Sequence, residues 1–146
     1  INNRVLEDQP FDLVISTHVC RGNYHSTWAA RGGYLPIAPL LFAREKVHTL
    51  YLEFDDERSG GFAPLRYVSP DKTVVLGLVT TKRPDLEDPE RIRERIKEAA
   101  QYVPLSRLSL SPQCGFASTE IGNKLTEEDQ WKKIALVRDI AQTVWG

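Results

Sequence analysis

Cysteine is scarce in this sequence, methionine is absent, and neither sign of charge is in excess. The 19 lysines and arginines are matched by 20 acidic residues, so the net charge is −1. A chain this close to neutral, without a Lys/Arg-rich block, lacks the basic surface that binds nucleic acid or an anionic membrane. No apolar run approaches the roughly 18 residues of a membrane span, and the first residues do not form a signal peptide. The sequence therefore predicts a cytoplasmic protein with no nucleic-acid or membrane partner.

Length and composition predict a single globular domain over residues 1–146. A chain of 146 residues has the usual size of one domain, and its apolar share of 41% suffices for a packed core. The chain begins without methionine, and its first ten residues look like the end of an element already under way. We therefore expect this domain to be a fragment of a longer protein.

Four short runs of apolar and β-branched residues are typical of strands buried on both faces, as in a parallel sheet covered by helices. Each run ends in a polar, loop-like stretch. The runs span residues 11–17, 49–54, 73–80 and about 105–110.

Helical patterns lie between and after these runs. Residues 36–45 predict a short helix, and a second helix begins at the cap Asp88 with Pro89 in its first position. The last helix begins at Thr126. We expect its apolar stripe to comprise Ile134, Val137, Ala141, Val144 and Trp145. Alternating strands and helices predict an α/β fold with a parallel sheet, either a small open sheet or half of a (β/α)8 barrel.

Polar residues with metal-binding atoms follow three of the predicted strands. His18 and Cys20 stand two positions apart at the first strand end, so their side chains point to the same face. Glu53 lies near the end of the second run, and Cys114 follows the fourth. Zinc accepts nitrogen, oxygen and sulfur ligands together, and ligands dispersed over strand ends are typical of catalytic rather than structural zinc sites.

Each of these residues also has a simpler interpretation. His18 is equally compatible with a core or surface position, Glu53 with a polar strand end, and Cys114 with a buried thiol. A disulfide between the two cysteines is disfavoured in a reducing compartment. Spacing alone leaves these alternatives open.

Longer motifs around these residues resemble one known family. His18–Trp28 (HVCRGNYHSTW), Tyr51–Asp55 (YLEFD), Val75–Val79 (VLGLV) and Ser111–Thr119 (SPQCGFAST) are similar to the C-terminal catalytic barrel of cobalamin-independent methionine synthases, and above all to their short bacterial relatives. The resemblance runs in order through nearly all 146 residues. It implies the last four units of a (β/α)8 TIM-type barrel.

The resemblance also implies a metal, a reaction and a set of site residues. Zinc would be held by His18, Cys20, Glu53 and Cys114, and a methyl group would pass from a methyl-folate to the thiol of homocysteine, giving methionine. Lys82 stands where the long enzymes carry a histidine, so it is the candidate catalytic residue. Arg21, Asn23 and Trp28, beside the H-x-C motif, are the candidate substrate-binding residues.

Two alternatives to this function remain. The thiol acceptor could be another small thiol of the coenzyme M type, because such relatives share the zinc ligands. The chain could also be a non-catalytic fragment with a structural zinc. A half barrel exposes strand edges, so we expect it to pair with its missing half or to self-associate.

Overall fold

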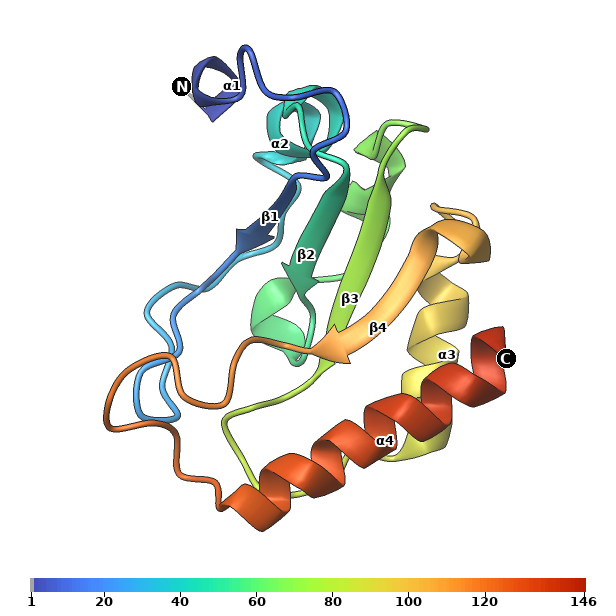
Figure 1. The fold of residues 1–146 in the computed structure, drawn as a ribbon. Helices are drawn as coiled ribbons and strands as arrows, with labels where there is room; N and C mark the ends of the chain where they lie inside the picture. Colours follow the sequence, from blue (N-terminus) through green and yellow to red (C-terminus); the bar gives the residue numbers. More distant parts are fainter. Residues whose placement is uncertain (1) are drawn as a thin grey trace.

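Four parallel strands form one sheet in the order β1-β2-β3-β4, as Figure 1 shows. The structure is a computed structural model that describes residues 2–146. All three strand pairs are parallel, which confirms the predicted α/β fold with a parallel sheet. The strands are β1 (Ser16–Val19), β2 (Thr49–Glu53), β3 (Thr73–Val79) and β4 (Leu108–Pro112).

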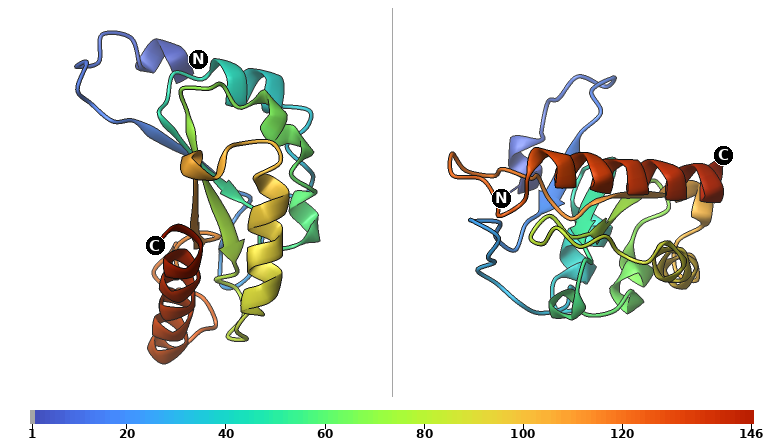
Figure 2. Two further views of the ribbon diagram at one scale, coloured as in Figure 1. Left: turned by 90° about the vertical axis from the view of Figure 1, so that its right-hand side faces the viewer. Right: turned by 90° about the horizontal axis from the view of Figure 1, so that it is seen from below.

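Helices connect and flank these strands. Figure 2 shows α2, η2 and α3 over one face of the sheet, while α4 runs alongside β4. Among the described residues, no helix is both long and apolar enough to cross a membrane. The α-helices are α1 (Asn2–Val5), α2 (Ala38–Arg44), α3 (Pro89–Ala99) and α4 (Glu127–Trp145), and the 3-10 helices are η1 (Glu57–Ser59), η2 (Ala63–Tyr67) and η3 (Leu105–Arg107).

The helix starts follow the predicted capping chemistry. The Asp88 carboxylate accepts a hydrogen bond from the Glu90 backbone N–H (2.9 Å), and Pro89 occupies the first position of α3. Thr126 and Asp129 form a reciprocal capping box at the start of α4. These caps satisfy backbone N–H groups that a helix start leaves without partners.

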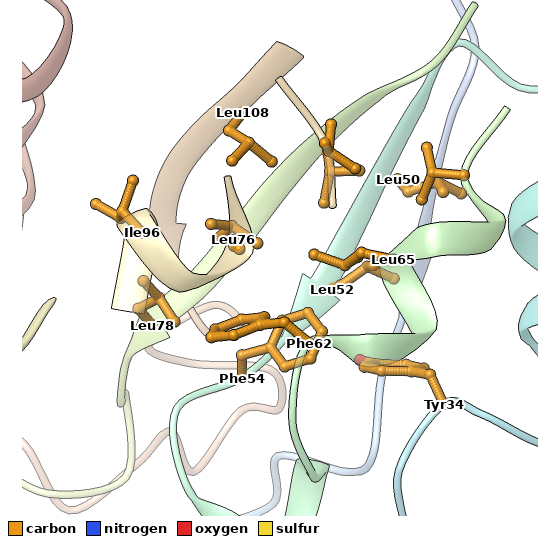
Figure 3. Close-up of a cluster of buried hydrophobic side chains, with 14 of the residues drawn as sticks. Tyr34, Leu50, Leu52, Phe54, Phe62, Leu65, Leu76, Leu78, Ile96 and Leu108 are labelled. Carbon is orange, nitrogen blue, oxygen red and sulfur yellow. The ribbon is translucent and has the colours of Figure 1, made fainter. Parts of the chain in front are cut away.

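The hydrophobic core lies between the sheet and the helices that cover one face (Figure 3). Alternate residues of β2 and β3 point into it, and η2 and α3 supply the opposing side chains. Aromatic rings close the lower end of this layer, with the Phe54 and Phe62 ring centroids 4.7 Å apart. The labelled members are Tyr34, Leu50, Leu52, Phe54, Phe62, Leu65, Leu76, Leu78, Ile96 and Leu108.

Two strand boundaries differ from the prediction. The first strand begins at Ser16 rather than at residue 11, because Phe11 and Val14 are exposed and pair with no neighbouring strand. The last strand covers Leu108–Pro112, whereas residues 105–107 form a 3-10 turn after Pro104. Apolar runs marked both strands correctly but did not locate their ends.

The buried face of α4 also differs from the predicted stripe. Val144 and Trp145 of the predicted stripe pack against the core, but Ile134 is 36% exposed. Ile140 and Leu136, which the prediction left out, lie on the buried face instead. Lys133 shares this face, and its buried ammonium pairs with the Glu87 carboxylate (3.1 Å). The buried face of α4 therefore includes Lys133, a charged residue that a search for apolar periodicity cannot identify.

Gly77 brings β3 against β2 and the end of β4. A Cβ at this position would stand 2.9 Å from both the Leu52 carbonyl oxygen and the Gln113 Cα, which are backbone atoms that cannot turn away. We therefore expect Gly77→Ala to destabilise the natural protein by about 1–3 kcal/mol. Urea unfolding would measure this. Gly61→Ala is the matched control, because a Cβ there meets nothing within 4 Å.

Candidate metal centre

The candidate centre lies where β1, β2 and β4 end. Because the strands are parallel, their carboxyl ends meet at one edge of the sheet, and in Figure 1 the loops after β1 and β4 lie there together. His18 is in β1, with Cys20 just beyond it, and Glu53 is the last residue of β2. Cys114 stands two residues after β4. This edge is where β/α folds place their chemistry.

The structure brings these four side chains together. One imidazole nitrogen, one carboxylate oxygen and two sulfurs lie within 4.8 Å of one another. Donor atoms at zinc bond lengths in a tetrahedron are about 3.3–3.8 Å apart, so small rotations would bring these atoms to coordination distance. Both cysteines are free thiols.

The backbone of Glu53 is held from two sides. Its N–H donates to the Tyr34 hydroxyl (2.8 Å), and the same hydroxyl donates to the Glu53 carbonyl (3.2 Å). Arg21 also donates to that carbonyl (3.3 Å), while its guanidinium lies over the Tyr34 ring at 3.9 Å from the centroid. Burial raises the pKa of Tyr34 to about 12, so its hydroxyl keeps the proton that it donates. The last residue of β2 therefore has a fixed main-chain position.

The Glu53 carboxylate is fully buried and surrounded by donors. Its Oε1 accepts from the Gln113 amide (2.7 Å) and lies 3.5 Å from His18 Nε2, while its Oε2 lies 3.5 Å from the Arg58 guanidinium. Burial alone would raise the pKa of this carboxyl. The hydrogen bonds from His18 and Gln113 outweigh burial and lower its pKa. The Glu53 carboxyl is therefore ionised at neutral pH and can act as a ligand of a cation.

His18 and Cys114 form a polarised pair. Hydrogen bonding to Cys114 and then to Glu53 raises the pKa of His18 to about 10. His18 in turn lowers the pKa of Cys114 to about 7. Without a metal, a proton on the imidazole thus offsets the negative charge of its neighbours. A divalent cation would take the place of that proton.

Two loops are tied together behind the sulfurs. The Asn23 amide donates to the Gly115 carbonyl (2.6 Å) and to the Ser118 hydroxyl (2.8 Å). Its oxygen accepts from Asn123 (2.8 Å), which also donates to the Thr81 carbonyl. These contacts join the loop after β1 to the loop after β4, and so set Cys20 opposite Cys114.

The other sequence candidates take different positions. Lys82 is buried, and its amine donates to the Gln113 side-chain oxygen (2.6 Å). Burial lowers the pKa of Lys82. Trp28 is exposed and lies over Arg58, whose guanidinium carbon is 5.8 Å from the ring centroid. Arg21 and Asn23 use their polar groups within the protein, so their contacts give them structural parts in the site, and their substrate-binding role stays a prediction.

A cavity of about 380 Å³ opens beside the donor cluster. Its size falls within the usual range for small-molecule pockets, about 300–1,000 Å³. A small molecule entering here would meet His18 and Cys114, the two candidate metal ligands that line it. Its walls are His18, Tyr51, Leu52, Ser111, Pro112, Gln113, Cys114 and Gly115.

Sequence reasoning missed the residues that hold Glu53. Gln113 stands beside Cys114 inside the quoted SPQCG motif, and residues adjacent along an extended chain point to opposite faces. The position of Gln113 next to a candidate ligand is the signal that could have identified it. Tyr34 and Arg58 gave no comparable signal, because each lies in a loop or 3-10 turn far along the chain from its contact.

Fold and donor set together define a parallel β/α domain with a candidate metal centre at the carboxyl edge of its sheet. Residues 11–142 match the model of the cobalamin-independent synthase catalytic domain. The chain belongs to this family, the cobalamin-independent synthases.

Individual relatives agree with this assignment. The uncharacterized proteins YxjG and YxjH of Bacillus subtilis are 55% and 54% identical over 144 residues, which are 98% of this chain and 38% of each relative. A Listeria monocytogenes protein assigned as a vitamin-B12 independent methionine synthase matches with 43% identity and a TM-score of 0.75, over 99% of this chain and 39% of that one.

A more distant solved structure supports the fold alone. The B12-independent methionine synthase of Shewanella sp. W3-18-1, in complex with selenomethionine, is 17% identical with a TM-score of 0.74, over 97% of this chain and 40% of that one. The present chain thus spans about two fifths of the length of its relatives. Its sheet corresponds to half of their barrel.

We call the hydrogen bonds that Asn23 makes to Gly115, Ser118 and Asn123 the two-loop clamp, and we expect them to fix the position of Cys114. Asn23 is buried, and Asn23→Ala removes its three side-chain hydrogen bonds, each of which contributes about 0.5–1.5 kcal/mol. Because Cys114 would lose its fixed position opposite Cys20, we expect zinc affinity in the natural protein to fall at least about tenfold. Competition with a colorimetric chelator would measure this.

Asn3→Ala is the matched control. Asn3 also makes side-chain hydrogen bonds, but with Arg44 and Lys46 at the end of α2. Equal zinc affinity in both variants would show that the clamp does not set the sulfur positions.

Proposed function

We propose that this chain is the zinc-binding part of a methyltransferase that moves a methyl group from a methyl-folate to the thiol of homocysteine, giving methionine. The observation that carries the proposal is the cluster of one nitrogen, one oxygen and two sulfur donors within 4.8 Å, in a chain of the cobalamin-independent synthase family. The donor and the acceptor belong to the whole protein, of which this chain covers part.

The donor set fits zinc. Thiolate sulfurs disfavour magnesium and calcium, and dispersed ligands from three strand ends match catalytic zinc sites. When bound, zinc would keep a substrate thiol deprotonated while leaving its sulfur able to attack. His18, Cys20 and Cys114 would form the stable part of the site, since sulfur and imidazole dominate zinc affinity.

Glu53 has the contacts expected of an exchangeable ligand. Gln113 donates to one oxygen of its carboxylate and Arg58 to the other. In the proposed reaction the thiolate sulfur forms a bond to the methyl carbon while the bond from that carbon to the folate nitrogen breaks. The bonding electron pair stays on the nitrogen, which then takes a proton from solvent.

The remaining candidates surround this centre. Lys82 would supply a fixed positive charge behind Gln113, rather than the proton exchange of a histidine. Trp28 borders a hollow of about 580 Å³ whose lining combines three arginines with two acidic residues: Arg31, Arg58, Arg83, Asp56 and Glu57. Under this proposal part of the methyl donor would lie in this hollow. Arg21 and Asn23 would support substrate binding by holding the chain around it.

The proposal is tested on the purified natural protein. We expect about one zinc per site by mass spectrometry, and methionine from homocysteine and 5-methyltetrahydrofolate. Removing the metal with dipicolinate should abolish turnover, and adding zinc back should restore it. Turnover that survives complete metal removal would contradict the proposal, and methylation of coenzyme M in place of homocysteine would point to the other acceptor.

Two substitutions separate the roles of the ligands. Cys114→Ser should remove zinc and activity together, because it leaves the metal with one sulfur. Glu53→Gln should keep most of the zinc and reduce kcat at least about a hundredfold, because it removes a charge without a sulfur ligand. Zinc content measured beside turnover decides this. A fully active Glu53→Gln protein, or one stripped of zinc, would refute the assigned role.

A further inference from the structure

Gln113 links a buried cation to the proposed carboxylate ligand. Its side chain is 1% exposed, and its amide nitrogen donates to Glu53 Oε1 at 2.7 Å. Its amide oxygen accepts from the Lys82 amine at 2.6 Å and from the Thr81 hydroxyl at 3.0 Å. The main chain is fixed as well, since the Gln113 N–H donates to the Val79 carbonyl (2.7 Å).

This environment allows one orientation of the amide. A lysine ammonium has only donors, so the group facing Lys82 must be the amide oxygen. The NH2 group is then directed at Glu53. A flipped amide would place its oxygen against a carboxylate and its NH2 against an ammonium, and both contacts would be repulsive. The orientation therefore follows from the partners alone.

The donor has different effects on the two states of Glu53. A carboxylate that shares its charge with a metal is a weaker acceptor than a free one, because hydrogen bonds strengthen with the charge of the acceptor. The bond from Gln113 thus stabilises a released carboxylate more than a coordinated one. It also occupies one lone pair of Oε1, the oxygen nearest His18. Both effects favour release.

We propose that Gln113 is a positioning residue that lowers the cost of replacing the Glu53 carboxylate with a substrate thiol. This rests on the proposed function, in which a small thiol enters the metal site. In that exchange the thiol would give its proton to water and its sulfur would become a ligand of the metal held by His18, Cys20 and Cys114, in place of the Glu53 carboxylate. Gln113 then keeps the free carboxylate in place for its return.

The exchange can be measured directly in the natural protein loaded with cobalt(II). The charge-transfer absorption between thiolate and cobalt grows with each sulfur ligand. L-homocysteine is the probe. Gln113→Met retains the length of the side chain and removes the donor, and we expect its half-saturating homocysteine concentration to rise about tenfold, equivalent to about 1.4 kcal/mol. Gln113→Glu retains acceptors for Lys82 and Thr81 but has no proton for Glu53. Its shift should be at least as large, because the released carboxylate would face a like charge.

Two further proteins complete the series. Lys82→Met leaves the Thr81 hydroxyl on the Gln113 oxygen, so a shift smaller than that of Gln113→Met is expected. Gln101→Met makes the same chemical change at an exposed turn after α3 and should match the unaltered protein. Metal content and melting temperature are recorded for each protein, since a residue with only a structural role would change those and not the homocysteine titration of loaded protein.

The outcomes separate this inference from the proposed function. No third thiolate in the unaltered protein would overturn the proposed function and, with it, the role of Gln113. A third thiolate with the same half-saturation in both Gln113 variants would overturn the inference alone. Loss of metal from both variants would also overturn it, because Gln113 would then build the site rather than ease exchange. If Gln113→Met does not fold, Gln113→Glu decides.

Discussion

A buried negative charge at Glu53 is the constraint around which this end of the sheet is organised. An unpaired carboxylate without exposure to water costs several kcal/mol, so it persists only with partners. Here the partners come from every side: His18 from β1, Gln113 from the end of β4, and Arg58 from η1. Each of these three residues also contacts other parts of the protein. The position of the carboxylate therefore depends on the fold as a whole rather than on one contact.

The sheet geometry makes this convergence possible. Parallel register places Glu53 opposite Gly77, and Gly77 opposite Ser111. The missing side chain of Gly77 lets Gln113 pass close over β3, and the register shift beside Val79 accompanies this close approach. Tyr34 and Arg21 then fix the main chain of Glu53 from the loop after β1. The packing of the strands and the geometry of the site therefore depend on the same residues.

Sequence patterns could predict what depends on local order. Apolar runs and caps identified all four strands and the main helices, since burial and N-terminal capping act over a few neighbouring residues. The pairing of His18 with Cys20 followed from strand alternation, and the approach of Glu53 and Cys114 followed from the common edge of parallel strands. Lys133, Tyr34 and Arg58 could not be predicted in the same way. Their burial depends on a partner far along the chain, such as Glu87 for Lys133, and no local period encodes that choice.

The net charge of the candidate metal centre explains why Arg58 and Lys82 lie near the Glu53 carboxylate. Two thiolates and a carboxylate bring one more negative charge than a divalent zinc ion neutralises. If a substrate thiolate replaced the carboxylate at the metal, Glu53 would keep its full charge in a buried position. Arg58 already lies beside Oε2, although Asp55 and Asp56 share its charge. Lys82 is buried, and Gln113 hydrogen-bonds both its amine and the carboxylate. The positive charge of Lys82 therefore acts on Glu53 without a direct ion pair that would hold the carboxylate away from the metal. A neutral amide between lysine and glutamate would thus keep the coordinated and released states of Glu53 close in free energy, as the proposed exchange requires.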